Sequence, residues 1–261
     1  GGLAGDAHLS MVRLPKGVTF LKPVPALVLL YLLWEATACV FPGWPSPRAV
    51  FGVLAADFQQ PAFRSALAGS AWRMAVGYVL VVLIGIGGGL LLGRIPLIDQ
   101  IMGSFAVAIH AIPGAAWVPL SVVWFGMTER AVIFTIVLGA AGIVMVNTDT
   151  GIREVPPFIA RASRTMGARG WNYFWFVVVP AAIPRMVDGL RLAWAFGWRA
   201  LMAGELLTSV SGLGQLLNQV AKAGQLDRLL AIMLLIALIG VTIDGLIFKR
   251  LEHEVRVRWG L

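Results

Sequence analysis

The sequence contains few charged residues, because Asp, Glu, Lys and Arg make up 13% of its 261 positions. Hydrophobic residues make up 59% and the mean hydropathy is +0.83, whereas a soluble domain has roughly half apolar and about a quarter charged residues. This balance leaves too little polar surface for a water-soluble globule. It excludes a disordered chain and a typical cytosolic enzyme, and it predicts that lipid surrounds much of the protein.

Motifs of catalysis and metal binding are also absent from the sequence. Cys39 is the single cysteine, which excludes a disulfide scaffold. No GxxxxGK(S/T) phosphate-binding loop or HExxH motif occurs, and the glycine-rich residues 85–93 lack a lysine and lie within an apolar run. We therefore expect that the chain is not an enzyme and that it holds no cofactor or metal.

Long apolar runs dominate the rest of the sequence. A bilayer-spanning helix needs around 20 mostly apolar residues. The third run is too long for one simple span and contains Pro113 and Pro119, so we expect a helix with an irregular end. The predicted fold class is an all-α polytopic membrane protein with six transmembrane helices, in a permease domain at 24–248. The six expected spans are residues 24–41, 74–92, 100–125, 131–146, 186–207 and 229–248.

Basic residues exceed acidic ones by 21 to 13, for a formal net charge of +8. A basic excess is also typical of nucleic-acid binding, but in a membrane protein Lys and Arg mark the cytoplasmic side. Most of the 21 lie on one side when both termini are cytoplasmic. We therefore expect a multi-pass protein in the bacterial plasma (inner) membrane, with no nucleic-acid partner. Its cytoplasmic parts are the tail 1–23, the loop 148–185 and the basic tail 249–261.

The loop 148–185 is the longest cytoplasmic segment. Asn147, Thr148 and Asp149 are expected to stop the fourth span before it, and Pro180 and Pro184 to close it. Its first part predicts one amphipathic helix that ends at Gly167, because apolar residues recur at helical spacing: these are Ile152, Val155, Ile159, Ala162 and Met166. An aromatic cluster follows: Trp171, Tyr173, Phe174, Trp175 and Phe176. Spacing alone leaves two interpretations, a docking element for a cytoplasmic partner or a helix lying among lipid headgroups.

The loop sequence RASRTMGARGWNYFWFVVVP, residues 161–180, resembles the EAA loop of the membrane subunit of bacterial ABC importers. The family pattern is Glu-Ala-Ala, three residues, Gly, nine residues, Ile, one residue and Leu-Pro. Arginine replaces the family's glutamate at 161, and serine replaces the second alanine at 163. The matching positions hold Arg161, Ala162, Ser163, Gly167, Val177, Val179 and Pro180.

Segments outside the loop resemble the nitrate, sulfonate and taurine branch of this family. They are residues 110–130, 146–157, 181–206 and 211–220, and the resemblance extends over about 24–261. It implies a binding-protein-dependent type I permease that works as a homodimer with two cytoplasmic ATPase subunits, which hold ATP and Mg, and an external substrate-binding protein. It also implies that the loop forms a coupling helix on the ATPase. The implied coupling residues are Arg161, Ala162, Ser163, Gly167, Ala168, Trp171, Val177 and Pro180.

A few polar or aromatic residues within the spans are candidates for the translocation path. A charge inside a membrane costs at least a few kcal/mol on insertion scales, so it needs a partner or an aqueous cavity. Arg199 therefore either attracts an anionic substrate or forms an ion pair with Glu205 or Glu35. Tryptophans at 117, 124, 194 and 198 either line a cavity or form an interfacial belt. The candidate residues are His110, Pro113, Trp117, Trp198, Arg199 and Glu205.

The segment 43–73 is expected to be external. It reads as a short amphipathic helix between prolines, with Arg48, Asp57, Arg64 and Arg73 on or near it. The binding protein is expected to rest there or on residues 208–226. The expected function is ATP-driven import of a small anion of the sulfonate/taurine, nitrate or organic carboxylate class. The alternative is a self-contained channel or secondary carrier, although the sequence shows no clear inverted halves.

Overall fold

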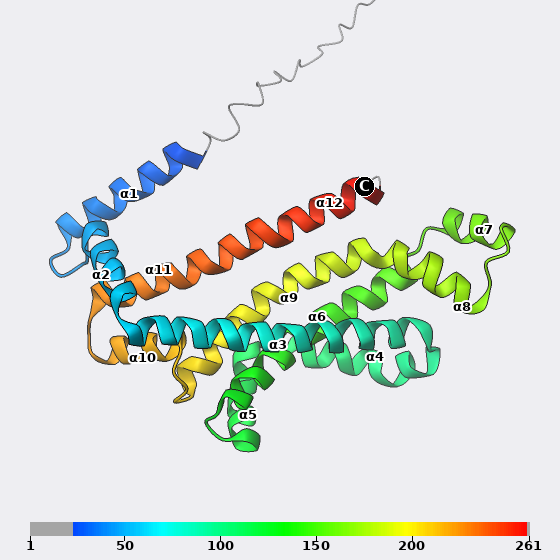
Figure 1. Cartoon of the computed structure of the whole chain (residues 1–261), viewed down its shortest axis with the longest axis horizontal. Helices are drawn as coiled ribbons and strands as arrows, with labels where there is room; N and C mark the ends of the chain where they lie inside the picture. The colour runs from blue at the N-terminus through cyan, green and yellow to red at the C-terminus, as the bar shows by residue number, and fades with distance from the viewer. Residues whose placement is uncertain (1–22, 260–261) are drawn as a thin grey trace, which may run out of the picture.

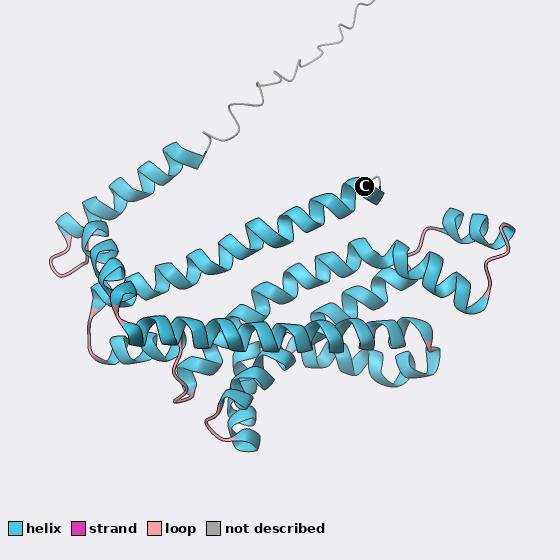
Figure 2. Ribbon diagram, viewed as in Figure 1, coloured by secondary structure: helices cyan, strands magenta, loops and turns pink. Residues whose placement is uncertain are grey.

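The computed structural model describes residues 23–259, so nearly all of the predicted tail 1–23 lies outside the described residues. Within 23–259 every regular element is a helix (Figures 1 and 2), and each of the six predicted spans is helical. The elements are α1 (Pro23–Val40), α2 (Pro47–Gln59), α3 (Pro61–Arg94), α4 (Pro96–Ala111), the 3₁₀-helix η1 (Gly114–Trp117), α5 (Val118–Phe125), α6 (Glu129–Arg153), α7 (Pro157–Thr165), α8 (Gly170–Tyr173), the π-helix η2 (Phe174–Val178), α9 (Val179–Leu207), α10 (Leu213–Lys222), α11 (Leu226–Ile243), the π-helix η3 (Asp244–Phe248) and α12 (Lys249–Trp259).

Three of the described helices are long and apolar enough to cross a bilayer. They are α3, α6 and the continuous helix Leu226–Trp259, which comprises α11, η3 and α12. Shorter apolar helices cover Pro25–Val40 and Gly114–Phe125. The prediction of an all-α polytopic membrane protein is therefore confirmed.

Several predicted helix ends are wrong. The helix α3 begins at Pro61, so residues 61–73 belong to this long helix, and the short helix between prolines is α2 alone. The helix α6 continues through Asn147 to Arg153, because the Asn147 amide donates to the Ile143 carbonyl (2.8 Å) within the helix instead of capping it. The third span was predicted correctly in kind, since the helix breaks between α4 and η1 at Pro113.

Pro184 does not close the loop but lies inside α9. Proline has no N–H, so the carbonyl four residues earlier, that of Pro180, loses its helical donor. The indole Nε1–H of Trp259 donates to that carbonyl instead (2.9 Å). The C-terminal helix α12 thereby satisfies the first turn of α9.

The centre of the bundle is formed by α3, α6 and α9. Glycines on one face of α3 lie against α6, and a Cβ at Gly89 would come within 2.6 Å of the Met145 carbonyl oxygen. On α9, a Cβ at Gly197 would meet Ile136 of α6 at 3.5 Å. Such small residues let helix backbones approach closely, as in other membrane bundles. Of the three candidate membrane spans, α6 is the most buried, with 61% of its apolar window inside the protein.

This bundle has two distinct ends. Figure 1 shows α7 and α8 at one end, and α2 and α10 at the other. Asp57 of α2 is 3% exposed and pairs with Arg228 of α11 (2.9 Å), so this acid is not available on the surface of α2. Arg48 and Arg64 are exposed, as expected for that end.

Candidate functional site

The loop between α6 and α9 contains two short helices instead of the single predicted one. Ile152 belongs to α6, and the Pro156–Pro157 pair separates it from α7, because a residue before proline disfavours helical backbone angles. Gly167 ends α7 as predicted. Its φ of +89° lies in the left-handed region, which residues with a Cβ rarely adopt. The chain then turns back through α8 and η2 into α9.

Aromatic residues hold this loop against the end of α3. The Arg94 guanidinium lies 5.4 Å from the Trp171 ring centroid and 4.9 Å from that of Phe174. Phe174 is 4% exposed and packs into a small core with Ile152 and Met186. The predicted aromatic cluster is therefore divided between a buried anchor and exposed rings, since Phe176 is 78% exposed.

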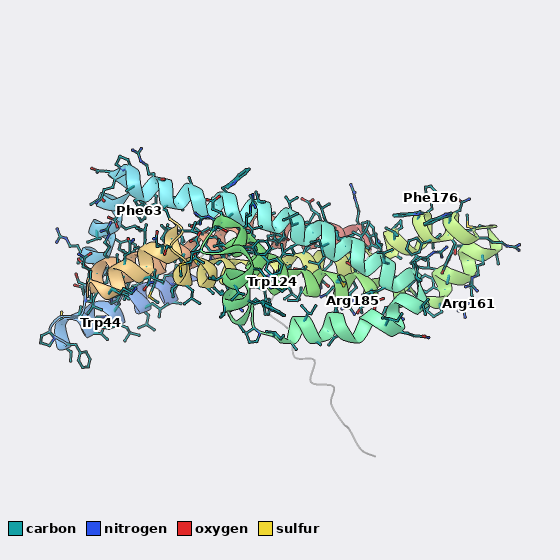
Figure 3. All side chains as sticks on the ribbon, turned by 90° about the horizontal axis from the view of Figure 1, so that it is seen from below. Trp44, Phe63, Trp124, Arg161, Phe176 and Arg185 are labelled. Carbon is teal, nitrogen blue, oxygen red and sulfur yellow. The ribbon has the colours of Figure 1, made fainter. Side chains whose placement is uncertain are left out.

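The residues matching the EAA pattern lie at this end of the molecule, where Figure 3 shows Arg161 and Phe176 projecting. Ser163 is half-buried, and its hydroxyl donates to the Ala160 carbonyl (3.1 Å). Half-buried Val177 and Pro180 lie in η2 and the first turn of α9. Ala168 is also half-buried. The exposed positions are Arg161, Ala162, Gly167 and Trp171.

Glu205 is fully buried near the opposite end and does not pair with Arg199. Its carboxylate accepts hydrogen bonds from Arg73 and from the Ser70 hydroxyl (2.8 Å) of α3, and from the Gly214 backbone N–H (2.9 Å) of α10. Arg73 is 1% exposed and also donates to the Ser211 carbonyl. Arg73 is therefore not available on the surface of the segment 43–73, and its expected external side stays a prediction. We call Ser70, Arg73 and Glu205 the buried charge cluster.

Two glycines let the α9–α10 loop close around this carboxylate. A Cβ at Gly212 would strike the Glu205 carboxylate, and one at Gly214 would lie 2.7 Å from the Met202 carbonyl oxygen. The sequence SGLG at 211–214 is therefore fitted to a buried acid. The two side-chain partners of Glu205 that the sequence analysis did not assign, Ser70 and Arg73, could have been found from their spacing. Ser70 and Arg73 are three residues apart, which places them on one face of a helix just before an uncharged run.

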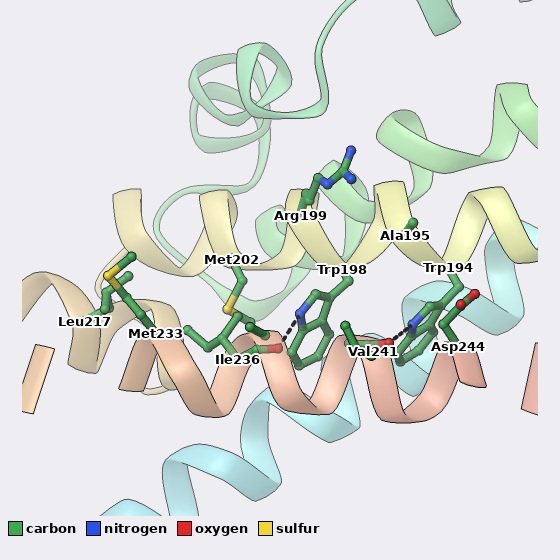
Figure 4. Close-up of a pocket in the computed structure, with 12 residues that line it drawn as sticks. Trp194, Ala195, Trp198, Arg199, Met202, Leu217, Met233, Ile236, Val241 and Asp244 are labelled. Atoms are coloured by element: carbon green, nitrogen blue, oxygen red, sulfur yellow. Dashed lines mark hydrogen bonds between the residues drawn. The ribbon is translucent and has the colours of Figure 1, made fainter. Parts of the chain in front are cut away.

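Trp198 and Arg199 are neighbours in α9 but point in different directions (Figure 4). Trp198 is 9% exposed, and its Nε1–H donates to the Ile236 carbonyl of α11 (3.2 Å). It stacks on Trp194 with ring centroids 5.8 Å apart. Trp198 thus joins α9 to α11 and, with Trp194 and Arg199, lines a groove of about 540 Å³ between these helices, instead of lying in an interfacial belt.

Arg199 is exposed, and its guanidinium lies 5.4 Å from the Phe196 ring centroid. Within residues 23–259 it forms no ion pair with Glu205 or Glu35. The predicted pairing is wrong because Arg73, which is far away in the sequence, occupies the carboxylate. The other interpretation, contact with an anionic substrate, stays a prediction.

The broken segment at Pro113 meets α9 close to Arg199. A Cβ at Gly114 of η1 would lie 3.2 Å from the Ala200 Cβ. Pro113 is exposed, and the Trp117 Nε1 is buried with no hydrogen-bond partner among the described residues. The side chain of His110, in the last turn of α4, lies outside the described part. Of the candidates, Trp198 and Arg199 line the same groove between α9 and α11, whereas Glu205 is buried in the charge cluster.

Comparison with known proteins identifies the family. A family model described as the inner membrane component of binding-protein-dependent transport systems matches residues 81–256. A protein of Methanocaldococcus jannaschii described as an ABC transporter permease is 32% identical over 229 residues, covering 85% of each chain. The taurine transport system permease of Escherichia coli is 31% identical, covering 68% of this chain and 65% of the relative. Permeases named for nitrate, bicarbonate and aliphatic sulfonates also match.

A solved structure supports the fold independently. The inward-facing methionine ABC transporter has a chain that matches with a TM-score of 0.64 at 20% identity, covering 74% of this chain and 96% of that one. The named relatives are transport permeases, and this chain is likewise a transport subunit and not an enzyme. It belongs to the binding-protein-dependent transport system inner membrane components, the permease subunits of ABC importers.

Proposed function

We propose that this permease moves a small anion from an external binding protein to the cytoplasm by alternating access, and that ATP hydrolysis on two partner ATPase subunits drives the movement. The observation that carries this proposal is the α7–α8 loop. It matches the EAA pattern of the family at Gly167 and Pro180, and it projects from one end of the bundle with exposed side chains.

The loop is suited to transmit movement because it is attached to two central helices. Arg94 at the end of α3 holds the rings of Trp171 and Phe174, and η2 continues directly into α9. A force on α7 and α8 therefore acts on α3 and α9 together. We infer that the ATPase subunits bind here and carry the ATP and Mg, and that the permease chain needs no cofactor.

The proposed substrate is a small anion such as a sulfonate, taurine, nitrate or an organic carboxylate. Arg199 supports this class, because an exposed guanidinium in an apolar helix can hold an oxyanion with two hydrogen bonds. The names of the relatives point to the same class. With the proposed topology, both termini and the α7–α8 loop are cytoplasmic, and α2 and α10 face the binding protein. Two copies of the chain form the permease.

Reconstitution tests this function. The chain is expressed with an ATPase subunit identified by its GxxxxGK(S/T) loop, purified as a complex and placed in liposomes with ATP inside. We expect uptake of radiolabelled taurine or nitrate only when ATP and the loaded binding protein are both present. Uptake by the permease alone would contradict the proposal and support a channel or secondary carrier. Failure of the ATPase to copurify would also contradict it.

A further inference from the structure

The α7–α8 loop has an unbalanced positive charge. Arg161 and Arg164 lie on α7 and Arg169 follows it, and all three are exposed. No Asp or Glu occurs between Glu154 and Asp188. Glu154 itself pairs with Arg185 (2.8 Å). The charge of the loop is therefore not neutralised by nearby acids in the sequence.

Arg161 is the arginine of α7 that is free to meet a partner. Arg164 lies over the Tyr173 ring, 5.7 Å from its centroid, whereas Arg161 forms no ion pair or ring contact within the described part of the chain. Phe158 precedes Arg161 by three positions and so lies on the same face of α7. Phe158 is 65% exposed and Met166 is 87% exposed. The surface of α7 thus combines apolar contact area with one uncommitted guanidinium.

We propose that this face docks on an ATPase subunit whose surface carries a carboxylate opposite Arg161. The inference rests on the proposed function, in which the loop meets the ATPase. Arg161 occupies the position where the family pattern has glutamate, so a groove that complements this chain must differ from one that complements that glutamate. Across an interface, complementary charges set the partner and the register, and like charges opposite each other are strongly unfavourable. The reversed charge therefore restricts the permease to an ATPase with an acidic groove.

A protein partner fits this surface better than a lipid headgroup layer does. Phe158, Met166 and Trp171 of the same loop are exposed, and a groove can bury these side chains together with the charge. The loop also projects beyond the end of the helical bundle (Figure 1). Binding of the loop to lipid phosphates is the competing outcome in the test.

The first experiment reverses the charge. The wild-type chain, Arg161→Glu, Arg161→Lys and the control Arg48→Glu are each expressed with the ATPase subunit. Arg48 is an exposed arginine at the opposite end of the bundle. We expect Arg161→Glu to weaken ATPase binding roughly tenfold or more, Arg161→Lys to weaken it less, and Arg48→Glu to leave it unchanged. Thermal unfolding of each permease shows whether the variant still folds.

The second experiment identifies the acid. A carbodiimide joins an amine directly to a carboxylate, so Arg161→Lys should crosslink to one Asp or Glu of the ATPase. Changing that acid to lysine should restore binding to Arg161→Glu. If wild-type permease binds the ATPase and Arg161→Glu binds equally well, the acidic groove is refuted while the proposed function stands. The acidic groove is also refuted, and the proposed function stands, if Arg161→Glu leaves ATPase binding unchanged and reduces only the binding to vesicles of anionic phosphatidylglycerol. If wild type binds no ATPase, the proposed function itself fails.

Discussion

Arg73 and Glu205 lie 132 positions apart in the sequence and form an ion pair in the interior of the protein, with exposed fractions of 1% and 0%. The pair joins α3 to α9, and its hydrogen bonds to Ser211 and Gly214 also fix the start of α10. The buried charge cluster is thus a junction of three helices at the end of the bundle away from the α7–α8 loop.

Replacement of Glu205 by glutamine should destabilise the protein strongly. The glutamine has a similar shape but leaves the buried Arg73 charge with only the exposed Glu129 as counter-charge, and breaking a buried pair costs about 3–5 kcal/mol. Glu129→Gln is the matched control, because Glu129 contacts the same arginine (3.4 Å) but has a side chain that is 57% exposed, where a pair contributes about 0–1 kcal/mol. Thermal unfolding in detergent compares the two. Equal losses would contradict the assigned role of Glu205.

Gly89→Leu should separate α3 from α6. A leucine there meets the Met145 carbonyl and Thr148, and overpacking of this kind costs about 1–3 kcal/mol. Gly87→Leu is the control on the same helix, because a Cβ at Gly87 has open space. We expect a lower unfolding temperature for Gly89→Leu and an unchanged unfolding temperature for Gly87→Leu. The close contact would be refuted if both variants retained wild-type stability.

Gly167→Ala should impair coupling while leaving the bundle intact. Its φ of +89° costs a residue with a Cβ roughly 1–2 kcal/mol, and relief of that strain changes the angle between α7 and α8. The measurement is ATPase activity of the reconstituted complex with and without the loaded binding protein. Gly52→Ala, in the middle of α2 with no atom near its Cβ, is the control. Unchanged stimulation in Gly167→Ala would count against a coupling role.

Arg199→Ala should reduce uptake without loss of stability. Arg199 is exposed and is not part of the buried charge cluster, so a change within ±0.5 kcal/mol is expected, as at other surface positions. Uptake of the anion should fall if the guanidinium contacts substrate, and Arg199→Lys should retain part of it. Arg64→Ala, another exposed arginine, is the control. A large fall in stability, as in Glu205→Gln, would show a structural role instead.

Hydropathy and spacing predicted the helical segments well, because lipid leaves a long apolar run few alternatives to a helix. Gly167 was also predictable as a break, since glycine after an amphipathic helix is a common stop signal. The different directions of the Trp198 and Arg199 side chains could have been predicted from helix geometry. At 3.6 residues per turn, adjacent residues in a helix point about 100° apart, so Trp198 packs on α11 while Arg199 stays exposed at the same groove.

The long-range contacts could not be predicted from one sequence. Glu205 had a nearby arginine at 199, but its true partner on α3 became evident only when the helices were assembled. The sequence likewise predicts that Pro184 closes the loop, because the contact that compensates for it inside α9 is also long-range. The indole that donates to the Pro180 carbonyl belongs to Trp259, 79 positions away, and no local sequence pattern predicts this contact.

The buried charge cluster also constrains the order in which the helices assemble. A ribosome adds about 5–20 residues per second, so Arg73 emerges roughly ten seconds before Glu205, which follows 132 positions later. During that interval the Arg73 charge lacks its main partner, and burying it among apolar helices without that partner is unfavourable. The junction of α3, α9 and α10 can therefore form only after α9 has been synthesised, and completion of the ion pair closes this end of the bundle.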